Sequence, residues 1–463
     1  MSVNQQPQQS PAKFGKWAKT SISARMLMIG ILILILLLPL SYIKNLINER
    51  MLRQQEVVQE INQKWGKEVL IYGPILKVPY KTYKEKIITN AVTKEQSKET
   101  QEIIKFAYFF PSELNIESNI NPDEKERGIY KTAVYQSTID MRGSFTKIDF
   151  NEEDIPPEDI LWKKAKFIIE TSNLKGVNDL VAIKINKNSY SFTSKYERAK
   201  NEYYGGNYVS LHKLESNSLA LADTPSEKPI QFTINLKVNG SKQIRFIPIG
   251  KETNVNITSD WKTANFIGEY LPFNSDKITE SGFDAKWKVL DINRPFSQKS
   301  FKGIPDLMKY SFGVNFMIPV DEYQKSERSI KYGFLVIGLT FLIFFLIQTM
   351  SKISIHPFQY LMIGVALTMF YTLLISISEH SSYLKAYLIA GVSVVSLITL
   401  YSKSILKNLK FPVFIAISLT ALYSFIFVII QLENYALLVG SIGLFVILAS
   451  VMYASRKIDW EQG

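Results

Sequence analysis

The sequence changes from polar to apolar near its middle, and this change limits what the chain can fold into. Residues 319–350 read PVDEYQKSERSIKYGFLVIGLTFLIFFLIQTM, and no side chain from Tyr332 to Met350 carries a charge. At 1.5 Å per residue, such a run is about long enough to cross a hydrocarbon core of roughly 30 Å. We therefore expect a water-soluble region over residues 44–331 and a membrane-embedded region over residues 332–453.

A second apolar block, residues 26–43, follows a basic N-terminal tail, residues 1–25. Leu and Ile dominate the block, and each favours insertion at a helix centre by roughly 0.3–0.6 kcal/mol. A cleaved signal peptide needs small residues after its apolar core, whereas Tyr42, Ile43 and Lys44 are bulky. We predict an uncleaved signal-anchor helix with the tail in the cytoplasm.

Apolar residues recur at helical spacing from Ile47 to Trp65, beyond the first apolar block. One interpretation is an amphipathic stalk that continues the membrane helix and ends near Gly66. The alternative is an ordinary helix that packs on the domain that follows. The spacing alone leaves both open.

Four more apolar runs follow the central one, at residues 360–377, 384–401, 411–432 and 436–453. With the runs at 26–43 and 332–350 they predict six transmembrane helices, five of them in a C-terminal bundle. If the N-terminus is inside, the short cytoplasmic loops and the tail at 454–463 carry Lys and Arg, whereas the turns at 378–383 and 433–435 carry none. This positive-inside asymmetry places both termini in the cytoplasm and residues 44–331 outside it.

Residues 72–316 mostly alternate between apolar and polar, which is typical of strands with one buried face. The clearest alternation runs from Ile230 to Val238 and meets Asn239-Gly240, a pair that predicts a β-hairpin turn. We therefore expect an α+β membrane protein. Its β-rich extracytoplasmic domain, in two packed sheets or sub-sheets, is inserted between the signal-anchor helix and the five-helix bundle.

The composition excludes or disfavours several kinds of binding site and reaction. The net charge of +12 fits the predicted topology better than nucleic-acid binding, because no basic helix carries interleaved aromatic residues. Cysteine is absent, which excludes disulfides and thiolate chemistry. The three histidines, His212, His356 and His380, do not share one predicted side of the membrane, so a zinc site is not expected. We predict no metal and no cofactor, although the sequence leaves an oxygen-only calcium or magnesium site open.

The tripeptide Ser378-Glu379-His380 contains the residue types of a hydrolytic triad. Adjacent residues point in different directions, whereas a triad needs its nucleophile, base and acid in series. We favour a polar turn that caps two membrane helices, and predict no catalytic site. His380 is still free in this reading to pair with a group from the outer domain.

Two other places carry candidate functional or structural residues. Arg127 and Tyr130 open a predicted strand, where they bind a partner or, in the ordinary alternative, form a surface ion pair. Pro319 is expected to end the last strand, and Asp321 to cap the helix that follows. Tyr323 is expected at headgroup depth with its hydroxyl in water. The alternative for this segment is a solvated acidic linker without fixed geometry.

Several short pieces of the sequence together resemble one protein family. They are FGVNFMIPVDEYQKSERSIKYGFLVIGLTFLIFF, Trp65-Gly66, RGIYKTAVY, Asn239-Gly240-Ser241, Ser259-Asp260-Trp261, IHPFQYLMIG, ENYALLVGS and RKIDW. In these pieces the chain resembles the CreD family. The resemblance implies an inner-membrane protein with a large periplasmic domain, associated with envelope stress and sensor-kinase-controlled expression, and no agreed catalytic site. TSNLKG, residues 171–176, departs from the pattern because an Asp is expected at Asn173.

Two classes of function remain. The first is a non-enzymatic inner-membrane protein that supports envelope integrity and the envelope stress response, with its outer domain binding a periplasmic protein or a cell-wall partner. The second is a transporter or lipid-handling protein that uses the bundle. Transport is less favoured because the six apolar runs lack Asp, Glu and Arg in their interiors. An intramembrane hydrolase is less favoured than either. The lipid bilayer is the one partner that both classes share.

Overall fold

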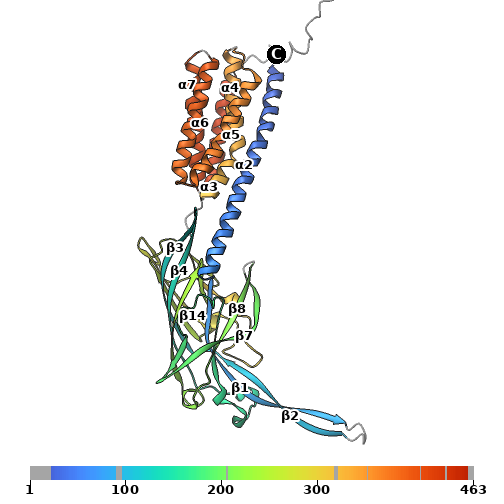
Figure 1. Cartoon of the computed structure of the whole chain (residues 1–463), viewed down its shortest axis with the longest axis vertical. Helices are drawn as coiled ribbons and strands as arrows, with labels where there is room; N and C mark the ends of the chain where they lie inside the picture. The colour runs from blue at the N-terminus through green and yellow to red at the C-terminus, as the bar shows by residue number, and fades with distance from the viewer. Residues whose placement is uncertain are drawn as a thin grey trace, which may run out of the picture. The chain divides into compact units, whose positions relative to one another are not determined.

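The computed structural model describes residues 22–89, 96–204, 207–316, 322–351, 353–406, 408–432 and 435–456 (Figure 1). The chain divides into two compact units. One holds Met1–Gln55 and Val320–Gly463, and the other is Glu56–Pro319. The first unit is helical and the second is almost entirely strand. This arrangement confirms the predicted α+β class, with one apolar helix before the β-rich unit and five after it.

Within the described residues, six helices are long and apolar enough to cross a membrane. They are α2 (Ile22–Trp65), α4 (Gly333–Ser351), α5 (Pro357–Ser378), α6 (Tyr383–Leu406), α7 (Lys410–Gln431) and α8 (Ala436–Ser455). Helix α2 is continuous over 44 residues, and the boundary between the units falls within it, after Gln55. In the helical unit, Ile29, Leu36, Leu40 and Ile47 of α2 are buried at steps of seven and four, which keeps them on one face.

Helix α3 (Glu322–Lys331) precedes α4 and belongs to the helical unit, although its charged sequence suggested the water-soluble region. Its buried residues recur at helical spacing and share one face; they are Tyr323, Ser326, Ser329 and Ile330. The compact units divide after Pro319, and the membrane boundary expected at residue 331 stays a prediction. These four buried positions form the packing face of α3, and the average polarity of the segment does not reveal that face.

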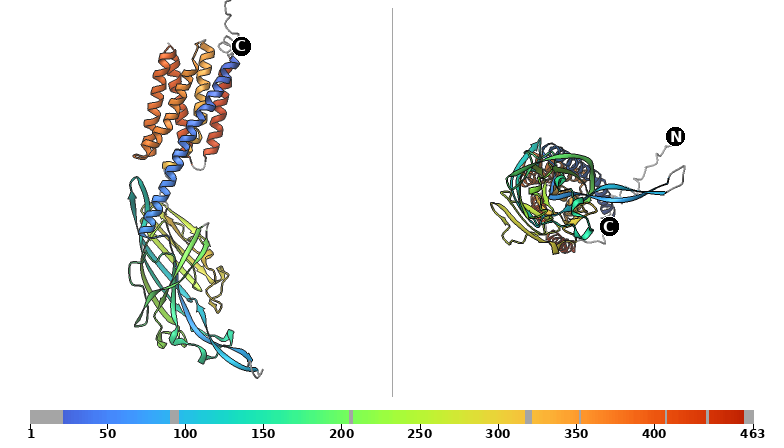
Figure 2. Two further views of the ribbon diagram at one scale, coloured as in Figure 1. Left: turned by 45° about the vertical axis from the view of Figure 1, so that its right-hand side comes forward. Right: turned by 90° about the horizontal axis from the view of Figure 1, so that it is seen from below.

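The described part of the β-rich unit is a 16-stranded sheet in the order β12-β16-β10-β1-β5-β8-β7-β6-β9-β4-β3-β11-β14-β13, with β2 on β1 and β15 on β2. The strands are β1 (Val69–Thr89), β2 (Gln96–Phe109), β3 (Glu113–Arg127), β4 (Tyr130–Phe145), β5 (Lys166–Thr171), β6 (Ala182–Ile185), β7 (Asn188–Tyr204), β8 (Asn207–Ser216), β9 (Ile230–Ser241), β10 (Gln243–Phe246), β11 (Glu252–Ser259), β12 (Ala264–Gly268), β13 (Ile278–Thr279), β14 (Gly282–Leu290), β15 (Lys299–Ser300) and β16 (Phe312–Phe316). Figures 1 and 2 show β1 and β2 extending away from the other strands as a two-stranded ribbon.

The two halves of this strand order pack face to face around one hydrophobic core. Phe145 on β4 lies 5.3 Å from Phe167 on β5, ring centre to ring centre. Trp287 on β14 lies 5.3 Å from Phe312 on β16. These rings come from opposite halves of the strand order, so the alternation seen in the sequence buries one face of each half against the other.

The hairpin predicted at Asn239-Gly240 is wrong. Strand β9 runs through this pair and bonds to β4 and β6, while β10 bonds to β1 and β16. Gly240 lies opposite Tyr135, whose ring occupies the space that a Cβ would need. The glycine therefore serves the close approach of an aromatic ring. The chain changes direction at Lys242, which has a φ of 61°.

Replacing Gly240 by Ala should destabilise the β-rich unit by about 1–3 kcal/mol, because the added methyl group forces the Tyr135 ring to move. Thermal unfolding of the detergent-solubilised protein, followed by tryptophan fluorescence, measures the effect. Gly338→Ala is the control, because no atom lies within 4 Å of its added Cβ. Equal melting temperatures for the two variants would contradict this account of Gly240.

Candidate functional site

Ser378, Glu379 and His380 follow one another at the end of α5 but lie in different environments. The Ser378 hydroxyl is buried and donates to a carbonyl of its own helix at 2.9 Å. The Glu379 carboxylate lies 3.3 Å from Arg50 Nε on α2 and accepts a bond from the Tyr323 hydroxyl at 3.4 Å. His380 is exposed. Among the described residues no hydrogen bond joins Ser378 to His380, so this geometry favours a structural turn.

Helix α3 is held to the ends of α5 and α6 by polar side chains. Tyr323 is buried and its hydroxyl bonds to Glu379, while the headgroup depth expected of it stays a prediction. The Glu322 carboxylate accepts from the backbone N–H of Tyr383, the first residue of α6, at 3.1 Å. Carboxylates stabilise helix N-termini in this way. The capping role expected of Asp321 and the strand end expected at Pro319 fall outside the described residues.

Glu379→Ala should lower the stability of the helical unit by about 1 kcal/mol, because Arg50 and Tyr323 each lose a partner. Glu379→Gln should be milder, since the amide oxygen still accepts from the tyrosine hydroxyl. Ser378→Ala and His380→Ala should leave the melting temperature in detergent nearly unchanged. A loss for His380→Ala as large as that for Glu379→Ala would contradict the structural role assigned to the turn.

Arg127 and Tyr130 are both close to the short loop between β3 and β4. Arg127 is exposed and forms an ion pair with Glu60 on α2. Hydrogen bonds from Arg127 and Lys64 lower the pKa of the Glu60 carboxyl to about 2. Tyr130 is buried, with 7% of its surface exposed. Arg127 thus makes the surface ion pair that the sequence offered as the alternative, and Tyr130 contributes to packing.

The last turn of α2 enters the β-rich unit at a tight contact. Trp65 Nε1 donates to the Tyr135 carbonyl at 3.3 Å. A Cβ on the next residue, Gly66, would meet the Asn239 carbonyl oxygen at 2.5 Å. Helix and sheet approach so closely here that only a glycine fits. Three pieces of the sequence that carried the family resemblance meet at this point.

Asn173 lies beside Gly66 and is 2% exposed. Its amide nitrogen donates to the carbonyls of Lys67 at 3.1 Å and Asn239 at 2.8 Å, and its oxygen accepts from the Gly176 N–H at 3.0 Å. A carboxylate has no proton for the two carbonyls. The asparagine therefore matches its surroundings, even though the family pattern predicted an Asp here.

Asn173→Asp should destabilise the β-rich unit by about 1–3 kcal/mol at neutral pH, because a buried carboxylate would face two carbonyl oxygens. This environment raises the folded-state pKa of the new acid. The loss should therefore shrink toward about pH 4, where the protonated acid donates one bond. Melting curves between these pH values test the slope, with the exposed Asn178→Asp as a matched control. A loss that did not depend on pH would contradict the proposed contact.

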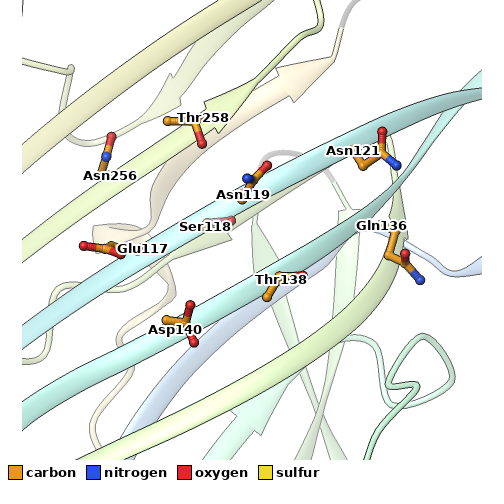
Figure 3. Close-up of a pocket in the computed structure, with 9 residues that line it drawn as sticks. All are labelled: Glu117, Ser118, Asn119, Asn121, Gln136, Thr138, Asp140, Asn256 and Thr258. Atoms are coloured by element: carbon orange, nitrogen blue, oxygen red, sulfur yellow. The ribbon is translucent and has the colours of Figure 1, made fainter.

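A polar depression of about 590 Å³ lies on the outer face of β3, β4 and β11 (Figure 3). Alternate positions on the three strands supply most of its lining: Glu117, Asn119 and Asn121 on β3, Gln136, Thr138 and Asp140 on β4, and Asn256 and Thr258 on β11. The remaining residue, Ser118, is buried with its Oγ 2.9 Å from Ser137 Oγ. Figure 3 shows the outer residues side by side on neighbouring strands.

Strand register arranges these side chains in rows. One row runs from Asn256 through Glu117 to Asp140, and the next from Thr258 through Asn119 to Thr138. Like charges directly opposite each other, such as Glu117 and Asp140, are destabilising. Asn235 Nδ2 offsets part of this cost by donating to Asp140 at 2.6 Å.

A second depression of about 510 Å³ shares Asn119, Asn121 and Thr258 with the first, and continues over β11, β14 and β13. We call the two together the polar groove. Its further lining residues are Ile120, Ser259, Asp260, Thr279, Ser281, Gly282, Phe283 and Asp284. No Lys, Arg or His lines either depression. Within the described residues, no group of three or more His, Asp or Glu is placed to hold a metal ion.

The polar groove was not predicted, although the sequence carries a signal for it. Asn is disfavoured in strands, yet the outward positions of NIESNIN and NVNIT repeatedly carry it. The sequence does not reveal which strands pair with β3. Its neighbours are β4 and β11, which are far apart in the chain.

A groove of about 430 Å³ lies between α6 and α7 in the helical unit. Small or hydroxyl-bearing residues line part of it, including Gly391, Ser396, Thr420 and Ser424. No charged residue lines it, so this groove is suited to apolar molecules.

Comparison with known proteins identifies the family. The sequence profile of a family described as "Inner membrane protein CreD" matches residues 21–461. The chain belongs to the CreD family. It is 27% identical over 434 residues to the Inner membrane protein CreD of Escherichia coli (strain K12), a match that covers 92% of this chain and 91% of that protein. With six apolar helices, this CreD-family chain is a multi-pass inner-membrane protein.

Proposed function

We propose that this CreD-family protein is a non-enzymatic inner-membrane protein that supports cell-envelope integrity and resistance to envelope stress. In this proposal the β-rich unit lies on the outer side of the membrane and binds a periplasmic or cell-wall partner through the polar groove. The groove is the observation that carries the proposal, because it is a rigid, polar and concave surface on paired strands.

The exposed ribbon of β1 and β2 carries a different set of side chains from the polar groove. On the ribbon of β1 and β2, opposite charges pair across strands, as in Lys98–Glu85 at 2.8 Å and Lys81–Glu102 at 2.8 Å. The polar groove instead carries neutral amides and hydroxyls, together with acids that face each other. Side chains that are unfavourable for a strand, gathered in one concave place, are typical of binding surfaces.

The proposed orientation in the membrane is supported by the distribution of Lys and Arg among the loops. The loops at 351–359 and 402–410 and the tail at 454–463 carry Lys and Arg, whereas the turns at 378–383 and 433–435 carry neither. The positive-inside rule then places both termini in the cytoplasm and the β-rich unit outside.

The orientation is testable with single cysteines, because the natural chain contains none. Ser381→Cys should react with a membrane-impermeant thiol reagent in cells whose outer membrane has been permeabilised. Ser404→Cys should react only after the inner membrane has been disrupted. Labelling of Ser404→Cys in intact inner membranes would overturn the proposed orientation.

The groove's role is testable with a matched pair of charge insertions on exposed strand positions. Thr138→Lys places a long side chain in the groove, and Gln231→Lys places the same side chain on β9, outside both depressions. Cells that depend on Thr138→Lys should survive envelope stress less well than cells with Gln231→Lys, at equal membrane levels. Equal survival of both variants at the wild-type level would contradict partner binding through the groove.

Lipid handling is a second candidate function, favoured by the uncharged groove between α6 and α7. Gly391→Leu would fill part of that groove, since the nearest atom to an added Cβ is 4.0 Å away. The candidate predicts a survival defect for Gly391→Leu and none for Thr138→Lys, which is the reverse of the main proposal.

A further inference from the structure

The charges along the polar groove restrict what it can bind. Glu117, Asp140, Asp260 and Asp284 line it, and no basic residue does, although Lys286 pairs with Asp284 at 3.4 Å from outside the lining. Phosphate, sulfate and carboxylate groups would therefore be repelled. A carboxylate only accepts hydrogen bonds, so a ligand beside Glu117 and Asp140 must present O–H or N–H donors.

The neutral side chains add a second requirement. Asn119, Asn121 and Gln136 each present both a donor and an acceptor, and Thr138 and Thr258 carry hydroxyls. The Asn256 side-chain oxygen is buried and has no hydrogen-bond partner among the described residues. A matching ligand must donate and accept at many closely spaced points, as the hydroxyl groups of a sugar do.

A folded protein partner fits the groove poorly. Binding energy in protein interfaces is concentrated in Trp, Tyr and Arg anchors seated in desolvated pockets. The groove has none of these residues, and its single aromatic ring, Phe283, is only 4% exposed and belongs to the core. Hydrogen bonding, rather than apolar burial, must therefore supply the affinity.

The length of the groove points to an oligomer. It crosses β4, β3, β11, β14 and β13, which are consecutive neighbours in the sheet. Four inter-strand spacings of about 4.8 Å give roughly 19 Å, which is longer than one sugar ring. Within each row, neighbouring side chains lie one inter-strand spacing apart along the groove.

We propose that the polar groove binds a neutral oligosaccharide. This inference rests on the proposed function and names the chemical class of the groove's ligand. The groove lacks an exposed aromatic ring for stacking, so binding is weak and depends on side chains from several strands at once.

Saturation-transfer NMR tests the proposal with the full-length protein in a detergent that has no sugar headgroup. The neutral probes are chitotetraose and cellotetraose, and tetragalacturonate is an anionic probe of the same length. Saturation should reach at least one neutral probe and not the anionic one. Thr138→Lys should lower the transfer by about tenfold or more, whereas Gln231→Lys should leave it unchanged.

A second variant distinguishes a loss of binding from a loss of folding. Asn119→Ala with Asn121→Ala removes two amides from exposed positions of β3 and adds no bulk. It should keep the parent melting temperature and lose most of the transfer. Transfer to the anionic probe only, or equal transfer in the parent and in this double variant, would overturn the oligosaccharide proposal.

The two proposals fail in different ways. If Thr138→Lys impairs stress survival but neither neutral probe receives saturation, the ligand class is wrong and the envelope function stands. If Thr138→Lys abolishes transfer and survival is unchanged, the groove binds sugar but the proposed function is wrong.

Discussion

The β-rich unit depends on how the chain passes from helix α2 into strand β1. Gly66 lets the backbone approach the Asn239 carbonyl, and Asn173 bonds to the carbonyls of Lys67 and Asn239 at the same place. Strand β1 then starts at Val69 and pairs with β10, β5 and β2. Because one strand supplies three pairings, its starting point sets the register of much of the sheet.

The polar groove is a consequence of that register. Strands β4, β3 and β11 align so that side chains far apart in sequence form rows across the strands. The inward residues of the same strands, such as Ile116, Ile139 and Ile257, are fully or almost fully buried. The inner face thus belongs to the core, and the outer face carries acids and amides. A surface with that division of roles is suited to binding.

In the helical unit, the polar contacts described above lie at the ends of helices. Glu379 meets Arg50 and Tyr323 at the end of α5, and Glu322 bonds to the first amide of α6. These contacts lie at helix ends, and the interiors of the six apolar runs contain no Asp, Glu or Arg. Charge inside a membrane is costly and usually marks a transport path.

The sequence by itself determined the six apolar helices and the β-rich region between the first two of them. Each of these follows from length and periodicity within one segment, which need no knowledge of neighbours. The sequence left open whether the helical segment after the first apolar run continues that helix, and the structure shows one continuous helix to Trp65. Tertiary structure decided the rest. Strand β9 shows perfect alternation and an Asn-Gly pair, but its partners are β4 and β6, and no local pattern reveals them. The same holds for the burial of Tyr323, the two carbonyls at Asn173 and the rows of the polar groove, because each depends on which distant segments the fold brings together.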